Sequence, residues 1–157
     1  MISLYDSMIR FFEEDGWYHK PFKNIHAIRL PFKGATADWA CIAQVQEENR
    51  LFVFYSVCPV KTTPENRLAV SEFIMLANYG MLIGNFEMDM SDGEIRFKTS
   101  VGLGQLDWSD ELAKVAVYTN VFSMNQYLSG LLKVMGGDIL PRNAVDIAEI
   151  GNDESDS

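Results

Sequence analysis

The sequence is poor in the residues that most often carry catalysis or hold metal ions. Its 157 residues include only two histidines, His19 and His26, and two cysteines, Cys41 and Cys58. None of them lies in a Cys-x-x-Cys or His-Glu-x-x-His arrangement, so no zinc site is predicted. Two cysteines also cannot form the disulfide scaffold of a small secreted protein. We interpret both as buried reduced thiols, with a redox pair on neighbouring strands as the alternative.

Other motifs of catalysis and cofactor binding are missing or incomplete. The segment Gly102-Leu103-Gly104 lacks the third glycine and the following helix of a dinucleotide site, and no Gly-x-Ser-x-Gly motif or P-loop is present. The carboxylates near Gly93 hint at calcium, but a calcium loop with this glycine would place Met88, Met90 and Thr99 at ligand positions. The sequence therefore predicts no catalytic residue, no cofactor and no metal, and we expect a protein that is not an enzyme.

Positive charge is scarce, and long apolar runs are absent. The chain has 13 basic against 22 acidic residues and a net charge of −9, which argues against nucleic acid or an anionic membrane as the main partner. No apolar run approaches the ~18 residues of a membrane-spanning helix, and no signal-peptide pattern occurs. We therefore expect a cytoplasmic protein. Its length suits one domain, residues 1–150, followed by a disordered acidic tail, residues 151–157.

The clearest pattern that the sequence does contain predicts a β-hairpin over residues 86–99. Asp92-Gly93 is a favoured pair for a two-residue turn. A hairpin centred there puts apolar pairs on one face and opposite charges on the other. The expected pairs are Phe86–Thr99, Met88–Phe97 and Met90–Ile95, with Glu87–Lys98 and Asp89–Arg96 opposite. The turn residues, the apolar pairs and the opposite charges all predict this same register.

A second hairpin, residues 37–46 and 50–57, is predicted around Glu48-Asn49. Both of its faces are largely apolar, so it should lie in the middle of the sheet. We expect the helices on the side of Trp39 and Phe54, because the opposite side carries two glutamines. That opposite side presents four candidate partner-binding residues: Ile42, Leu51, Val53 and Tyr55. Cover by a loop or terminal segment is the alternative, and a different turn register would exchange the two faces.

The helical pattern supplies the remaining elements. Helices are predicted for residues 3–15, 63–78 and 109–135, with a short one over 141–150 and an edge strand at 25–30. The helix over 109–135 would be near 40 Å long, and a break within it is left open. The main order is α-β-β-β-α-β-β-α, an α+β fold with a five-stranded, twisted antiparallel sheet and helices on one side.

Two segments carry a resemblance to a known family. They are NYGMLIGNFEMDMSDGEIRFKTSV, residues 78–101, and NVFSMNQYLSGLLKVMGG, residues 120–137. With the element order, they make the chain resemble the bacterial YbjN-domain family over about residues 1–137. The most specific parts are Asn78-Tyr79-Gly80, Gly84-Asn85-Phe86-Glu87 and Asp92-Gly93-Glu94. The resemblance implies a fold similar to class I type III secretion chaperones, which are small, acidic, usually homodimeric proteins that hold a segment of a partner.

Three functional hypotheses follow from these patterns and from what the resemblance implies. The first is a non-enzymatic, homodimeric protein-binding module, chaperone-like or a sensory transduction regulator. It would hold a partner segment on the apolar sheet face and at an exposed strand edge. The second is a small-molecule sensor or minor enzyme with a pocket between sheet and helices. A structural subunit whose apolar face is covered by its own copy is a third reading.

Overall fold

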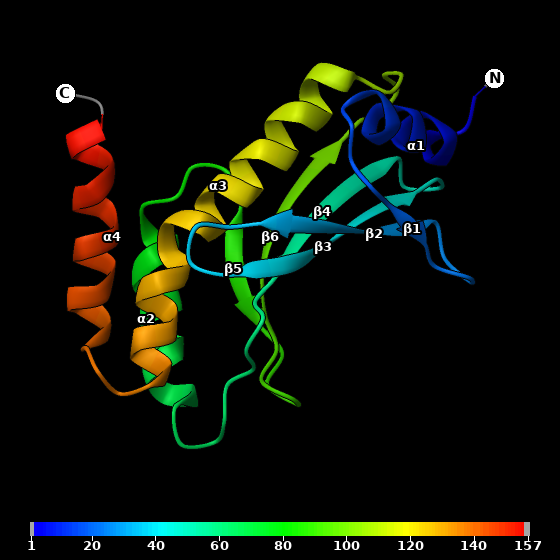
Figure 1. The fold of residues 1–157 in the computed structure, drawn as a ribbon. Helices are drawn as coiled ribbons and strands as arrows, with labels where there is room; N and C mark the ends of the chain where they lie inside the picture. The colour runs from blue at the N-terminus through cyan, green and yellow to red at the C-terminus, as the bar shows by residue number, and fades with distance from the viewer. Residues whose placement is uncertain (1, 156–157) are drawn as a thin grey trace.

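In the computed structural model the backbone is described for residues 2–155 and the side chains for residues 2–150. The described chain has four helices and six strands (Figure 1). In chain order these are α1 (Leu4–Glu14), β1 (Lys20–Pro21), β2 (Ala27–Lys33), β3 (Asp38–Gln46), β4 (Leu51–Val57), α2 (Arg67–Tyr79), β5 (Asn85–Met88), β6 (Ile95–Gly102), α3 (Asp110–Met135) and α4 (Pro141–Ser155). The α+β class and the order of the longer elements agree with the prediction.

The strands form one antiparallel sheet in the order β1-β2-β3-β4-β6-β5. It has six strands rather than the predicted five, because the two residues of β1 pair with Arg29 and Ile28 of β2. So short a strand has no alternation that a sequence pattern can reveal. Pairs such as Gln46–Leu51 and Cys41–Ser56 confirm the predicted register of the central hairpin, β3–β4.

The register predicted for the β5–β6 hairpin is wrong by two residues. Glu87 pairs with Arg96 and Met88 with Ile95, so the connecting loop is longer than two residues. The aspartates build this loop: Asp89 Oδ1 accepts from Ser91 N at 2.8 Å, and Asp92 Oδ1 accepts from Glu94 N at 2.9 Å. Because side chains alternate with a period of two, the slip leaves every residue on its predicted face.

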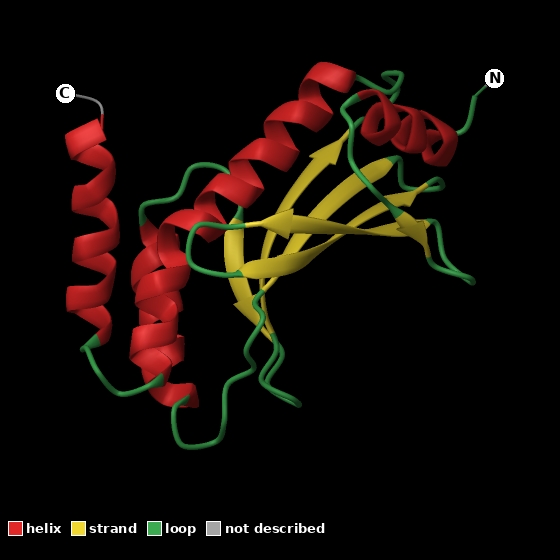
Figure 2. Ribbon diagram, viewed as in Figure 1, coloured by secondary structure: helices red, strands yellow, loops and turns green. Residues whose placement is uncertain are grey.

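The helices bury one face of the sheet. The buried face carries Cys41, Ala43 and Phe54 from the central hairpin and Phe97 from β6, all without solvent exposure. Helices α1 and α3 contact this face, and α2 and α4 pack beside α3 (Figure 2). Burial of these aromatic side chains supplies the main driving force for folding.

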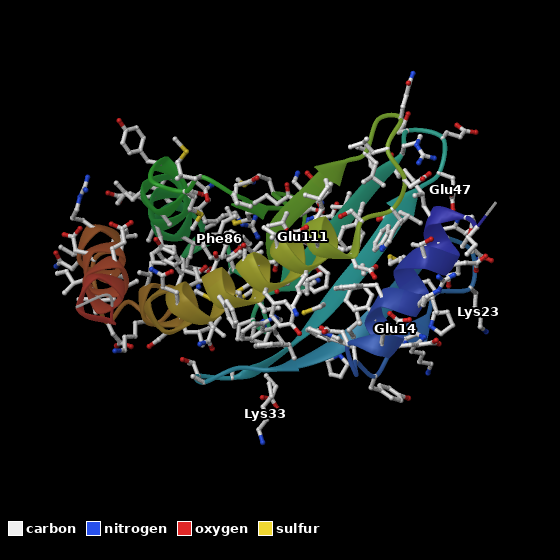
Figure 3. The ribbon with its side chains drawn as sticks, turned by 90° about the horizontal axis from the view of Figure 1, so that it is seen from above. Glu14, Lys23, Lys33, Glu47, Phe86 and Glu111 are labelled. Carbon is white, nitrogen blue, oxygen red and sulfur yellow. The ribbon has the colours of Figure 1, made fainter. Side chains whose placement is uncertain are left out.

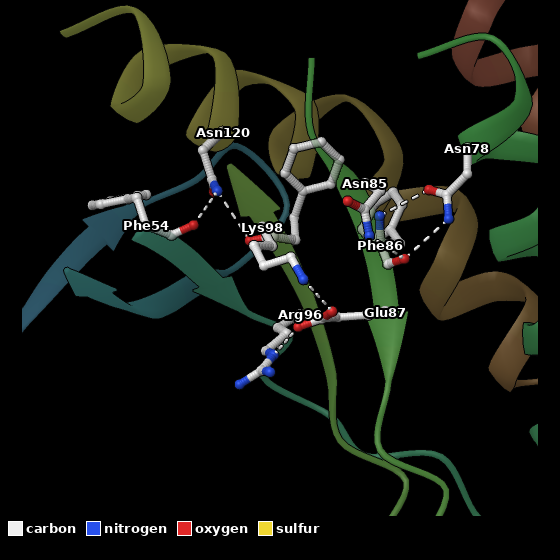
Figure 4. Close-up of polar contacts among 9 residues, drawn as sticks. Phe54, Asn78, Asn85, Phe86, Glu87, Arg96, Lys98 and Asn120 are labelled. Atoms are coloured by element: carbon white, nitrogen blue, oxygen red, sulfur yellow. Dashed lines mark hydrogen bonds and ion pairs between the residues drawn. The ribbon is translucent and has the colours of Figure 1, made fainter. Parts of the chain in front are cut away.

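Polar contacts fix two of the helices on the sheet. The carboxylate of Glu47, in the β3–β4 turn, accepts hydrogen bonds from Leu4 N and Tyr5 N at the start of α1 (Figure 3). On α3, the amide of buried Asn120 donates to Phe54 O and Phe97 O, both at 2.9 Å (Figure 4). Asn120 therefore ties the long helix to two strands at once.

Several helix boundaries differ from those predicted. Helix α2 begins at Arg67 rather than near Thr63, because Asn66 Oδ1 accepts from Thr63 N and folds residues 63–66 into a turn. Helix α3 is continuous over 26 residues, without the break that the sequence left open. Helix α4 extends beyond residue 150, and residues 156–157 of the expected acidic tail lie outside the described residues. No helix among the described residues is long and apolar enough to span a membrane.

Candidate protein-binding surface

The sheet face opposite the helices carries all four of the candidate partner-binding residues. We call it the open face. Ile42 and Tyr55 form a direct cross-strand pair, and both are partly exposed. Leu51 is also partly exposed, whereas Val53 is 9% exposed. The structure therefore groups the four residues on one surface, with Ile42 and Tyr55 at its centre and Val53 largely covered by its neighbours.

Cross-strand pairing arranges the open face in rows that run across the strands. One row contains Lys20, Arg29, Ile42, Tyr55, Lys98 and Asn85 in that order. The next row contains Pro31, Ala40, Val57, Arg96 and Glu87. The first row places Ile42 and Tyr55 between charged or polar side chains on both sides, whereas the second row has charged side chains on the β6–β5 side only. The apolar patch is therefore framed by charge.

A charged cluster lies beside Tyr55 on this face. Glu87 accepts hydrogen bonds from Arg96 and, at 2.9 Å, from Lys98 (Figure 4). The guanidinium of Arg96 lies 4.2 Å from the centre of the Tyr55 ring. Desolvation raises the pKa of Glu87, but the hydrogen bonds from Lys98 and Arg96 outweigh it and hold the pKa below its ordinary value. Glu87 is therefore ionised at neutral pH and holds both cations in place.

A groove of about 680 Å³ lies at the β2 end of the open face. Apolar residues of three strands line it, among them Pro31, Ala40 and Val57. Lys20, Arg29 and Lys33 line it as well, and Figure 3 shows Lys33 projecting away from the helices. The groove combines an apolar lining with three basic side chains and one carboxylate, that of Asp38.

The sequence suggested an exposed strand edge, and the two edges of the sheet are covered to different extents. One edge strand, β1, has only two residues. At the other, the side-chain amide of Asn78 pairs with the backbone of β5: Phe86 N donates to Asn78 Oδ1 at 2.8 Å, and Asn78 Nδ2 donates to Phe86 O at 3.0 Å (Figure 4). These bonds occupy the outward backbone groups of Phe86, with which a further strand would pair. The β5 edge is thus closed at Phe86, whereas residues 30–33 of β2 extend past the two residues that pair with β1.

His26 and the two cysteines make packing contacts, and Cys58 also lines the groove. His26 packs on Tyr5 with 5.0 Å between ring centres. Cys41 and Cys58 are free and buried, and burial raises the pKa of the Cys41 thiol to about 12. No group of His, Cys, Asp and Glu among the described residues could hold a metal ion.

A second exposed apolar surface was missed by the sequence analysis. Leu68, Met75 and Tyr79 project from α2, and Leu82 follows just after the helix; each of these is more than 70% exposed. We call these four residues the α2 stripe. The spacing of Leu68, Met75 and Tyr79, seven and four residues, could have predicted this surface, since residues so spaced share one helix face. The residues that frame the open face were also missed, because only the register brings Arg29, Arg96 and Lys98 beside Ile42 and Tyr55.

Comparison with protein families agrees with this architecture. Residues 5–131 match the model of the YbjN family, described as "Putative bacterial sensory transduction regulator". The chain belongs to the YbjN family. The match covers β1 to β6 and most of α1 and α3, including the Asn78 segment, and ends before α4. No curated protein sequence matches the chain.

Solved structures show the same fold at low sequence identity. The crystal structure of YbjN from E. coli, described as "a putative transcription regulator", aligns with a TM-score of 0.61 at 13% identity, covering 77% of this chain and 85% of that one. The crystal structure of the ExsC–ExsE complex aligns with a TM-score of 0.56 at 11% identity, covering 82% and 96%. The predicted similarity to type III secretion chaperones is thereby confirmed for the fold.

Proposed function

We propose that this YbjN-family protein is a non-enzymatic protein-binding module that holds a segment of a partner on its open sheet face. The observation that carries the proposal is the uncovered apolar pair Ile42–Tyr55 in the middle of the sheet. The solvent-facing side of an antiparallel sheet is normally polar, so an apolar pair uncovered there is typical of an association site.

The fold neighbour supports a protein as the ligand. ExsC, whose fold this chain shares, is found in a complex with ExsE. The Asn78 contact with Phe86 favours binding on the face over addition of a strand at the β5 edge. We propose a binding role of this kind, regulatory or chaperone-like.

The proposal includes a homodimer, with the cytoplasm as its location. Leu68, Met75 and Tyr79 of the α2 stripe form an apolar helix surface apart from the open face, suited to contact with the same surface of a second copy. Assembly through α2 would leave Ile42 and Tyr55 free for the partner. The two apolar surfaces would then have separate tasks.

Site-specific photo-cross-linking tests both assignments with three aromatic positions. The cross-linking residue p-benzoylphenylalanine replaces Tyr55 on the open face, Tyr79 on α2, or Phe122 on α3, which is 63% exposed and serves as the matched control. The variants are expressed in the native cell, irradiated and separated by mass.

The expected pattern separates the three positions. Position 55 should cross-link to a different protein, position 79 to a second copy of this chain, and position 122 to neither. A cross-link from position 55 to a second copy would replace the proposal with a subunit that covers its own open face. Equal capture of the same proteins at positions 55 and 122 would overturn it.

A further inference from the structure

The charges of the open face have the opposite sign to those of the whole chain. The outward positions of the six strands include five basic residues: Lys20, Arg29, Lys33, Arg96 and Lys98. They include two acidic residues, Asp38 and Glu87. The face thus carries a formal charge of +3, whereas the chain carries −9. A surface of this kind attracts an anionic partner although the molecule as a whole repels it.

The positive charges are placed symmetrically around the apolar centre. In the row of Ile42 and Tyr55, Arg29 follows on one side and Lys98 on the other. Neighbouring strands are ~4.8 Å apart, so the backbones at Arg29 and Lys98 are separated by about 14 Å. Arg29 is exposed and forms no ion pair with any side chain among residues 2–150. Its guanidinium lies over Phe22 at 5.7 Å, which keeps it at the surface.

Building on the proposed function, we propose that the open face selects an extended acidic segment of a protein. The segment lies across the strands with an apolar side chain on Ile42 and Tyr55 and a carboxylate at each end of the row. An extended chain rises ~3.3 Å per residue, so carboxylates four residues apart span about 13 Å. They point to the same side as the residue midway between them. The pattern is therefore acidic-x-apolar-x-acidic.

Glu87 acts as an internal competitor in this arrangement. Its carboxylate already accepts from Lys98 at 2.9 Å and from Arg96. A carboxylate of the partner must share or displace it to reach Lys98, whereas Arg29 has no such competitor among the described residues. Removing the charge of Glu87 should thus tighten binding, a result that a purely apolar surface would not give.

Selection of random 12-residue peptides displayed on phage tests the pattern directly. The full chain is the bait, and selection is repeated with Arg29→Gln/Lys98→Gln and with Lys114→Gln, which removes a positive charge from the exposed side of α3. The strongest peptide is then synthesised with a fluorescent label, and its Kd is measured by anisotropy at 50 and 500 mM salt.

We expect enriched peptides with acidic residues four apart around an apolar one. Each charge removed from the row should weaken binding about two- to fivefold, the range of exposed ion pairs. Lys114→Gln should have no effect, and Arg29→Lys should retain most of the affinity. High salt should weaken binding, and Glu87→Gln should tighten it about two- to fivefold.

The outcomes separate the inference from the proposed function. Peptides without acidic enrichment whose binding is lost with Tyr55→Thr would overturn the acidic pattern and leave the proposed function standing. Selected peptides that Tyr55→Thr does not affect, or no enriched peptide at all, would overturn both. Saturable binding of a labelled 20-nucleotide RNA that the peptide fails to compete, but that Arg29→Gln/Lys98→Gln abolishes, would assign the charges to a different ligand and overturn the inference.

Discussion

The two faces of the sheet have similar apolar content on the central strands and opposite surroundings. Inward residues such as Phe54 are fully buried under the helices, whereas the adjacent outward residue Tyr55 is partly exposed beside Arg96. The inner face is tied to α3 by an uncharged amide, that of Asn120, and the open face is framed by ionised groups. Apolar content alone therefore does not distinguish a core from a binding surface. The two are distinguished by what surrounds them in the fold, helices on one face and ionised side chains on the other.

Truncating consecutive aromatic residues should produce the largest contrast between the faces. Phe54→Ala leaves a cavity in the core and should cost about 3–5 kcal/mol of unfolding free energy. Tyr55→Ala removes a side chain that is partly in water, and we expect a cost below about 1.5 kcal/mol. Urea unfolding followed by circular dichroism measures both. Equal costs would show that the open face is as fully packed as the core.

The link between the inner face and α3 should give the next largest effect. Asn120→Ala removes the donor to Phe54 O and Phe97 O inside the core, and should cost about 2–3 kcal/mol. Asn125→Ala, on the same helix, removes an acceptor for Ala35 N near the surface and serves as the control, at about 1 kcal/mol or less. The same urea experiment applies, and a control as costly as Asn120→Ala would contradict the special role of this contact.

The charged cluster of the open face should give a smaller, pH-dependent effect. Its lowered pKa means that the stability contributed by ionised Glu87 is present above the ordinary value of 4.5 and is lost as the pH falls through the folded-state value. Glu87→Gln should therefore cost at most about 1 kcal/mol at pH 7 and less near pH 3.

Unfolding free energies of wild type and Glu87→Gln between pH 3 and pH 7 measure this difference. Glu72→Gln on the exposed side of α2 is the control, because Glu72 forms no ion pair with the described residues. A difference that grows toward acid would contradict the assigned sign.

A thiol probe should distinguish the faces with almost no change in stability. Cys41 is fully buried with a pKa of about 12, so Ellman's reagent should leave it unmodified in the native protein. A cysteine placed by Ser100→Cys on the exposed, outward side of β6 should react within minutes. Cys58 is also buried, with its pKa raised by burial, and should stay unmodified as well. Fast reaction of all three thiols would mean that the helices open readily from the sheet.

Local patterns in the sequence predicted one hairpin register and not the other. The β3–β4 register follows from Glu48-Asn49 and the apolar alternation, and Gln46–Leu51 pairing confirms it. In β5–β6 the same logic was wrong by two residues, because Asp89 and Asp92 bond to the backbone of their own loop instead of across the ladder. A slip of two residues keeps each side chain of β5 and β6 on its predicted face. The grouping of Ile42 with Tyr55 lies in the β3–β4 hairpin and did not depend on that turn.

Features set by contacts between distant segments could not be predicted. The pairing of Lys20 with Arg29 depends on β1, a two-residue strand that is too short to show a sequence pattern. The start of α2 depends on the side chain of Asn66, which also donates to Met135 O at the far end of α3. The basic frame of the open face likewise depends on the order of strands, which the sequence pattern leaves undetermined.

Asn78, which caps the edge strand β5, has a consequence for the behaviour of the protein at high concentration. Its amide donates to and accepts from Phe86 in the way a neighbouring strand would, from a residue near the end of α2. Without it, β5 would present free donors and acceptors to any other copy, and sheets could join edge to edge into fibres. The asparagine thereby closes the β5 edge at Phe86 to pairing with another copy, while the apolar face of the same sheet stays exposed.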